Sequence, residues 1–239
     1  MTYRTLIRAA AIVAALGCAG QSNAAGQADL PVQLPLAAFT SRPVLVLPTR
    51  FLGDDGSLGW GAQVGDPNSY LGDLDAEIAF ALKQRGIDKQ WILPPAIVRS
   101  VRRNPGFATD PYDLTADWLR PPLKKPPEHF PEPFASQVRS LVALQEGAQY
   151  VLYPVEVRFE PVEVEGQPEP RSGNGSSGPE GGAAGGRMEG RAVLRIALLD
   201  ARRSKIVWMA DVVSDPYPSF SPALAASVAE HLADLIAKR

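Results

Sequence analysis

Residues 192–213 read AVLRIALLDARRSKIVWMADVV, and this stretch indicates the fold class more clearly than any other. Apolar side chains recur at every second position in both of its halves, as expected of β-strands with one buried face. The apolar positions are Ala192, Leu194, Ile196 and Leu198 in the first half and Ile206, Trp208, Ala210 and Val212 in the second. A polar segment at 200–205 separates the halves, so we predict an antiparallel hairpin.

A third strand of the same kind precedes the hairpin. The apolar residues Tyr153, Val155, Val157 and Phe159 alternate with Pro154, Glu156, Arg158 and Glu160. We therefore expect one apolar face and one face in water. Residues 166–190, which follow, are Gly-rich and cannot bury enough apolar surface to order themselves. The sequence predicts a three-stranded meander with a disordered insertion.

The first half of the chain alternates short strands with helices. The run VLVL at 44–47 is typical of a strand buried on both faces, and 91–93 is a second short strand. Between them we predict a helix at 73–86, with Asp73 as its N-cap. Further helices are expected at 96–103, at 134–146 and after Ser221. Strands that are joined through helices pair in parallel.

These elements predict an α/β (α+β) fold with a single mixed β-sheet. An antiparallel meander lies at the carboxy-terminal side of the sheet, and helices pack against it. We expect one domain at 43–239, with a Pro-rich insertion at 104–133 in addition to the Gly-rich insertion at 166–190. A short helix is expected near 114–119. The aromatic residues of the Pro-rich insertion should bury themselves: Phe107, Tyr112, Trp118 and Phe130.

The first 24 residues resemble a secretory signal. Arg4 and Arg8 precede an apolar run at 9–17, and the sequence Ser-Asn-Ala at 22–24 resembles a cleavage site. The apolar run is shorter than the ~20 residues that span a bilayer. We therefore expect export, with a tether at 25–42. Cys18, the only cysteine, is either removed with the signal or carries a lipid anchor; both interpretations stay open.

Composition narrows the classes of partner. The formal net charge is −2, and the basic residues form no concentrated stripe in the sequence. We therefore expect no nucleic-acid partner, and membrane contact only through an anchor at Cys18. A hydrophobic content of 45% favours a folded chain over a wholly disordered one.

Several short motifs resemble one superfamily. These motifs are VLVLP at 44–48, GAQYVL at 147–152, LRIALLDA at 194–201 and IVW at 206–208. They are similar to those of the superfamily that includes the TolB amino-terminal domain, the curli secretion channel subunit and the lipoprotein activators of penicillin-binding proteins. The resemblance covers most of 43–237. It implies a protein of the periplasm or outer membrane that binds other cell-envelope proteins and has no catalytic residues.

The loop after the first strand is the best candidate for a binding surface, because ligands of α/β proteins often bind where a strand ends. We expect Trp60 and Tyr70 to be exposed there, beside Asp54 and Asp55. Its Gly spacing matches no phosphate-binding motif. Asp66, Asn68 and Glu77 fall at calcium-loop positions, but Leu71 stands where that loop needs Gly, so we expect no metal and no cofactor.

The leading hypothesis is therefore a non-enzymatic envelope protein that docks other proteins through its loops or a free sheet edge. The alternative is a periplasmic domain that binds a small molecule or glycan through the loop at 53–72. An enzyme is the third hypothesis, and it would require His129 or His231 beside carboxylates or a serine.

Overall fold

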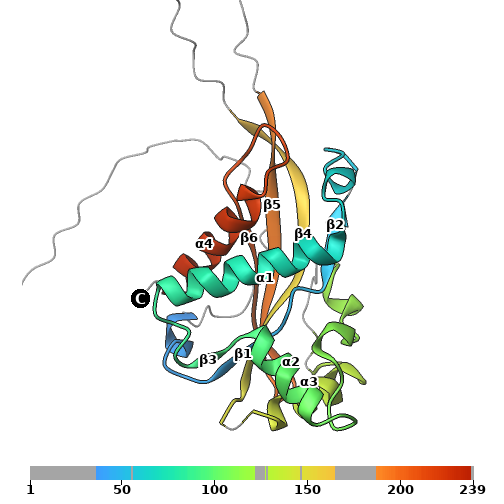
Figure 1. Ribbon diagram of the computed structural model, residues 1–239, viewed down its shortest axis with the longest axis vertical. Coiled ribbons are helices and arrows are strands. Elements are labelled where there is room, and N and C mark those ends of the chain that lie inside the picture. The colour runs from blue at the N-terminus through green and yellow to red at the C-terminus, as the bar shows by residue number, and fades with distance from the viewer. Residues whose placement is uncertain are drawn as a thin grey trace, which may run out of the picture.

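The computed structural model describes residues 36–54, 56–121, 127, 129–145, 147–164 and 187–237 (Figure 1). Its helices are α1 (Pro67–Gln84), α2 (Pro94–Arg103), α3 (Phe134–Ala143) and α4 (Ala223–Ala237). Its strands are β1 (Val44–Val46), β2 (Phe51–Asp54), β3 (Trp91–Ile92), β4 (Tyr150–Val164), β5 (Arg187–Asp200) and β6 (Lys205–Val213). Single 3₁₀ turns lie at Leu36–Phe39, Gly61–Gln63, Pro111–Asp113 and Asp117–Leu119.

The strands form one mixed sheet in the order β3-β1-β4-β5-β6, and β2 pairs with β4 beyond the end of β1. The pairs of β1 with β3, of β1 with β4 and of β2 with β4 are parallel. The pairs of β4 with β5 and of β5 with β6 are antiparallel. The predicted fold class, with its carboxy-terminal meander, is confirmed.

Helices cover the sheet on both faces. One core packs α1 and α4 against the sheet side chains Val44, Val46 and Leu152. The other core packs α2, α3 and the Pro-rich segment against Leu45, Val151 and their neighbours. Because β1 alternates between the two cores, all three of its side chains are buried, as the VLVL run predicted.

Two β-bulges correct the predicted strand faces. The register of β4 shifts between Pro154 and Glu156, so Tyr153 faces the α2–α3 core while Phe159 faces the α1–α4 core. A second shift, in the pairing of β5 with β6, sends Ile206 to the face opposite Trp208. A bulge adds one residue to one strand, so the alternation changes face. The prediction of one apolar and one wet face for 153–160 is therefore wrong.

Two elements near the first strand also differ from expectation. The loop predicted after Pro48 contains β2, which pairs in parallel with β4. Helix α1 begins at Pro67, and its N-cap is Asp66, whose carboxylate accepts from the backbone N–H groups of Asn68 and Ser69; the predicted cap at Asp73 is wrong. Asp followed by Pro is a strong start signal, since proline at the first turn needs no N–H partner.

The structure describes different shares of the two insertions. In the Pro-rich segment Phe130 is buried, but Phe107 and Tyr112 are 58% and 45% exposed, so the expected burial of those two rings is wrong. Of the Gly-rich insertion, residues 187–190 belong to β5, and 166–186 lie outside the described residues. At the amino-terminal end, Leu36 and Phe39 of the expected tether are buried in the α1–α4 core. Residues 1–35 are outside the described part.

The close approach of β5 to Trp60 predicts a large effect at Gly190. A Cβ added there would overlap the indole of Trp60 and would lie 2.7 Å from Leu58 Cδ1. We expect Gly190→Ala to lower the free energy of unfolding by about 1–3 kcal/mol, the usual cost of overpacking, as measured by urea denaturation. Gly72→Ala is the control, because its added Cβ meets nothing within 4 Å and alanine favours a helix by roughly 0.5–1 kcal/mol. Equal stability of Gly190→Ala and the unmodified chain would contradict the packing described here.

Candidate functional site

Trp60 and Tyr70, the two aromatic residues expected at the surface, are buried. They are 5% and 8% exposed, and both pack on Phe159 and Phe220. The expectation that they are exposed is wrong, because the segment between β2 and α1 folds back over the sheet. Asp54 ends β2, but its side chain, like all of Asp55 and Cys18, lies outside the described part of the structure.

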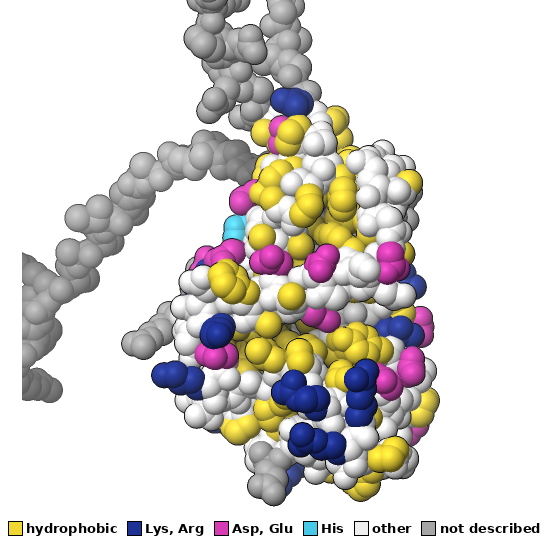
Figure 2. Space-filling model, in the orientation of Figure 1, with side chains coloured by type: hydrophobic (Ala, Val, Ile, Leu, Met, Phe, Trp, Pro, Cys, Tyr) yellow, Lys and Arg dark blue, Asp and Glu magenta, His cyan; other side chains and the backbone are white. Residues whose placement is uncertain are grey.

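Tyr70 nevertheless lines a cleft, which we call the α1–α4 cleft. Helices α1 and α4 approach each other closely at the carboxy-terminal end of α1 and diverge toward its amino-terminal end (Figure 1). The space between the diverging ends holds about 360 Å³. It is lined by Val64, Ser69, Tyr70, Asp73, Ala76, Glu77, Phe220, Pro222 and Ala225. Figure 2 shows hydrophobic side chains in a hollow above α1, with acidic side chains along its lower border.

Ion pairs join α1 and α4 where the two helices approach each other, at what we call the closed end of the cleft. Arg85, at the C-cap of α1, lies 2.6 Å from a carboxylate oxygen of Glu230 and 2.7 Å from one of Asp234, both on α4. Both carboxylates are about half exposed, so the pairs supply roughly 1 kcal/mol or less each. Their main consequence is geometric, because they hold the two helices together at this end only.

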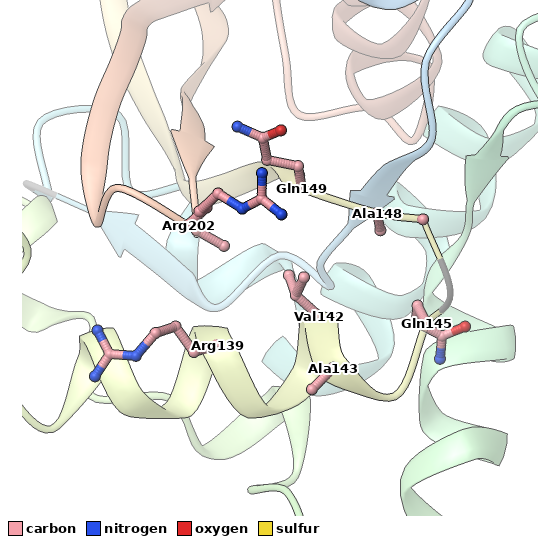
Figure 3. A pocket seen from close by; sticks show the side chains of 9 residues that line it. Arg139, Val142, Ala143, Gln145, Ala148, Gln149 and Arg202 are labelled. Atoms are coloured by element: carbon pink, nitrogen blue, oxygen red, sulfur yellow. The ribbon is translucent and has the colours of Figure 1, made fainter.

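A second hollow, of about 430 Å³, lies between the end of α3 and the turn after β5 (Figure 3). Arg139 and Arg202 line it, but the guanidinium of Arg139 points away from Arg202 and already binds Glu132 and the hydroxyl of Ser204. The hollow also faces the carboxy-terminal end of α3, where the helix dipole disfavours anions. Because of these two features, the hollow is poorly suited to bind an anion.

The enzyme hypothesis required His129 or His231 to lie beside carboxylates or a serine. His231 Nε2 lies 3.8 Å from Asp215, and the hydroxyl of Ser227 donates to the same carboxylate at 3.1 Å. The serine therefore bonds to the acid rather than to the imidazole, and a nucleophile needs its base within hydrogen-bond reach. His129 lies apart from this group, with Nδ1 3.2 Å from the carbonyl oxygen of Arg203.

The position of α1 argues against a calcium-binding loop that begins at Asp66. Residues 67–77 are helical, so Asp66, Asn68 and Glu77 do not lie on one metal-binding loop. In the described parts of the chain no group of three or more His, Cys, Asp or Glu side chains is arranged to hold a metal ion.

Asp75 is a partly buried carboxylate that the sequence did not mark as a functional residue. Its Oδ1 accepts hydrogen bonds from the backbone N–H and the hydroxyl of Thr49, at 2.9 and 2.7 Å, just after β1. Its Oδ2 is buried and has no partner. Burial raises the pKa of Asp75 to about 6, against the opposing effect of the two Thr49 hydrogen bonds. Only the tertiary contact between α1 and the end of β1 reveals this group.

Strand β6 forms one edge of the sheet, and its backbone polarity can be assigned. The N–H of Ser214 donates to the carbonyl of Ala192, so Ser214 faces β5. Successive residues of an antiparallel strand alternate, so the N–H and C=O groups of Val213, Asp211 and Met209 point away from β5. His231 Nδ1 lies 2.6 Å from the carbonyl oxygen of Val213, which agrees with this assignment.

The edge of β6 also has little charge to repel another strand. Asp211, the acidic residue of the strand, is held by Arg195 and Arg158 at 3.0 and 2.7 Å, so its charge is neutralised from within the sheet. Natural edge strands commonly use short length, proline or unpaired charge to avoid pairing with other chains. Apart from its one bulge, β6 shows none of these over nine residues.

Comparison with protein-family models, curated proteins and solved structures found no match for this chain. The resemblance to the TolB-like superfamily therefore stays a prediction. Among the helices that the structure describes, none has both the length and the apolar character needed to cross a membrane.

Proposed function

We propose that this chain is an exported, non-catalytic protein of the cell envelope that binds other envelope proteins, and that the edge of β6 is its docking surface. The observation that carries the proposal is the open edge, with the N–H groups of Met209 and Asp211 directed away from β5. An extended segment of a partner that paired with this edge would satisfy those groups by β-augmentation. The leader-like sequence at 1–24 supports export, and the superfamily resemblance supports the class of partner.

The half-buried side chains of β6 suit such pairing. Ile206, Val207 and Trp208 are each partly exposed, and β-branched and aromatic residues favour strand pairing. Backbone hydrogen bonds would supply affinity, and these side chains would contribute specificity. Two anchoring states, a free periplasmic protein and one tethered through Cys18, are both compatible with this proposal.

Asp211 offers a matched pair of variants that tests the edge. Asp211→Pro removes one outward N–H, and proline is tolerated on edge strands where its nitrogen faces away from the ladder. Asp211→Asn keeps the N–H and removes the same charge, so it controls for the lost ion pairs with Arg195 and Arg158.

The experiment places a photo-crosslinking amino acid at Val207 in the full chain, expressed in its native host, with Lys83 on α1 as the control position. We expect a discrete crosslinked envelope protein from Val207 but not from Lys83. Asp211→Pro should reduce its yield at least fivefold, roughly the loss of one hydrogen bond worth 1 kcal/mol, and Asp211→Asn should leave it within twofold. Equal crosslinking from both positions, or equal yields from both Asp211 variants, would argue against docking at this edge.

A further inference from the structure

The outer face of α2 carries three arginines. Arg99, Arg102 and Arg103 are spaced at i, i+3 and i+4, so they project from one face of the helix. All three are exposed, whereas Pro94 and Ile97 on the opposite face are buried. Figure 2 shows dark blue side chains gathered over and beside α2, whereas most acidic side chains in this view lie along α1 or toward the right-hand border. The helix is therefore amphipathic, with a basic face directed into solvent.

These arginines lack the partners that hold other arginines of the protein. Among the residues that the structure describes, none forms an ion pair with Arg99, Arg102 or Arg103, whereas Arg85 and Arg158 each bind two carboxylates. The helix dipole favours basic residues in the last turn, which accounts for Arg102 and Arg103. Arg99 lies in the middle of α2, so the dipole does not account for it.

The turn that follows α2 exposes an aromatic ring. The N–H of Phe107 donates to the carbonyl of Asn104 at 3.2 Å, and the side-chain amide of Asn104 donates to the carbonyl of Ser100 at 2.9 Å. These bonds join the turn to the end of the helix. Phe107 is 58% exposed, and Tyr112, on the same Pro-rich segment, is 45% exposed. Transfer of such rings from water to an apolar phase is favourable.

The basic and aromatic groups belong to one surface. Burial raises the pKa of Tyr112, the charges of Asp75 and Asp110 add to this rise, and Arg102 opposes it. The hydroxyl of Tyr112 therefore lies within electrostatic range of Arg102. The carboxylate of Asp110 accepts the backbone N–H of Tyr112 at 3.0 Å and caps the 3₁₀ turn there. We call this surface the α2 patch, and its members are Arg99, Arg102, Arg103, Phe107 and Tyr112.

We infer that the α2 patch binds the surface of an anionic phospholipid membrane. Guanidinium groups bind phosphate through two parallel hydrogen bonds, and phospholipid headgroups present phosphate in a dense layer. Aromatic side chains on a basic surface bury themselves at the boundary between headgroups and acyl chains, which suits the exposed ring of Phe107. A small anion would neutralise the arginines but leave the rings in water.

This contact goes beyond the expected anchor at Cys18. The sequence shows no concentrated basic stripe, because the helix and not the sequence brings Arg99 together with Arg102 and Arg103. The inference also does not depend on docking at β6, since it concerns a different element.

The test measures co-sedimentation of the full chain with vesicles at about 0.1 M salt. One set of vesicles contains equal amounts of phosphatidylcholine and the anionic lipid phosphatidylglycerol, and the other contains phosphatidylcholine alone. We expect binding to the anionic vesicles to be at least tenfold tighter, and to weaken at least fivefold at about 0.5 M salt, because salt screens the charges. Equal binding to both kinds of vesicle would overturn the inference.

Variants assign the binding to the α2 patch, because the apolar run at 9–17 of the full chain could itself enter lipid. The triple variant Arg99→Gln/Arg102→Gln/Arg103→Gln should weaken binding to the anionic vesicles at least tenfold. Glutamine and arginine have similar helix propensities, so α2 should be retained, which circular dichroism checks. Unchanged binding by the triple variant would overturn the inference.

A second triple variant controls for the change in net charge. Lys83→Gln/Lys89→Gln/Arg202→Gln removes three positive charges at exposed positions outside the α2 patch. We expect its binding to stay within threefold of that of the unmodified chain. Equal losses in the two triple variants would show a general charge effect and overturn the assignment to α2.

The aromatic contribution has its own matched pair. Phe107→Ala should weaken binding about fivefold, because it removes the ring that enters the membrane boundary. Phe80→Ala, at a similarly exposed site on α1 (54%), should stay within twofold. Binding of polyglutamate by the unmodified chain, without binding to the anionic vesicles, would overturn the inference in favour of an acidic protein. Asp211→Pro should bind vesicles as the unmodified chain does, so failure at the β6 edge and failure at the α2 patch are distinguishable.

Discussion

Trp60→Ala is expected to lower the free energy of unfolding by about 3–5 kcal/mol, the range for removing a large buried aromatic side chain. The indole is 5% exposed, lies 5.8 Å from the ring of Phe159 and 6.2 Å from that of Phe220, and covers Gly190 of β5. Its removal would leave a cavity between the sheet and the segment that leads into α1. Urea denaturation monitored by circular dichroism measures the change.

Phe107→Ala is the matched control for this prediction. Phe107 is also an aromatic residue outside the regular elements, but it is 58% exposed, so its removal should change stability by no more than about 0.5 kcal/mol. If the Trp60 and Phe107 variants were destabilised equally, Trp60 would not be a core residue. The sequence-based expectation of an exposed Trp60 would then be right after all.

Asp75 is expected to make stability depend on pH in an unusual direction. Burial raises its pKa to about 6 in the folded protein, above the value of 3.8 for an unperturbed carboxyl group. The folded state therefore binds this proton more tightly than the unfolded state. The contribution to stability is most favourable below about pH 4 and is lost as the pH rises through 6, by roughly 3 kcal/mol for a shift of this size.

The comparison of the unmodified chain with Asp75→Asn isolates this effect, because other groups titrate alike in both proteins. The free energies of unfolding are measured by urea denaturation at about pH 4 and pH 7. We expect the difference between the two proteins to change by roughly 2 kcal/mol across this interval, in favour of Asp75→Asn at the higher pH. Asp113→Asn, at an exposed site, should track the unmodified chain. A difference that stays constant with pH would contradict the burial of Asp75.

The parts of the fold that follow from local pattern could be predicted. The apolar stripe of β5 and the VLVL strand each depend on a repeat within one segment, and the structure confirms them. The bulges in β4 and β6 could not be predicted, because a bulge is a property of two paired strands. Alternation along one strand gives no sign of where the partner register shifts.

In the candidate site, too, some features follow from local sequence and others depend on distant residues. The sequence drew attention to the segment that contains Tyr70, but it could not show that this segment folds onto the sheet. That path depends on Gly190, 120 residues later, which leaves room for Trp60. Asp66-Pro67 is a recognisable helix start signal, but the surrounding Gly, Asp and Asn residues led to the prediction of a loop there. The pairing of Arg85 with Glu230 and Asp234 of α4 likewise joins residues 145 and 149 positions apart, which local pattern cannot show.

The most direct test of docking at β6 is backbone amide hydrogen exchange, measured on the full chain alone and in complex with the partner captured from the envelope. In the free protein the amides of Met209 and Asp211 point away from the sheet and should exchange quickly. In the complex we expect strong protection of both amides, with little change at Val212, whose N–H already faces β5. Unchanged exchange at Met209 and Asp211, with protection at another surface, would contradict docking by strand addition to β6.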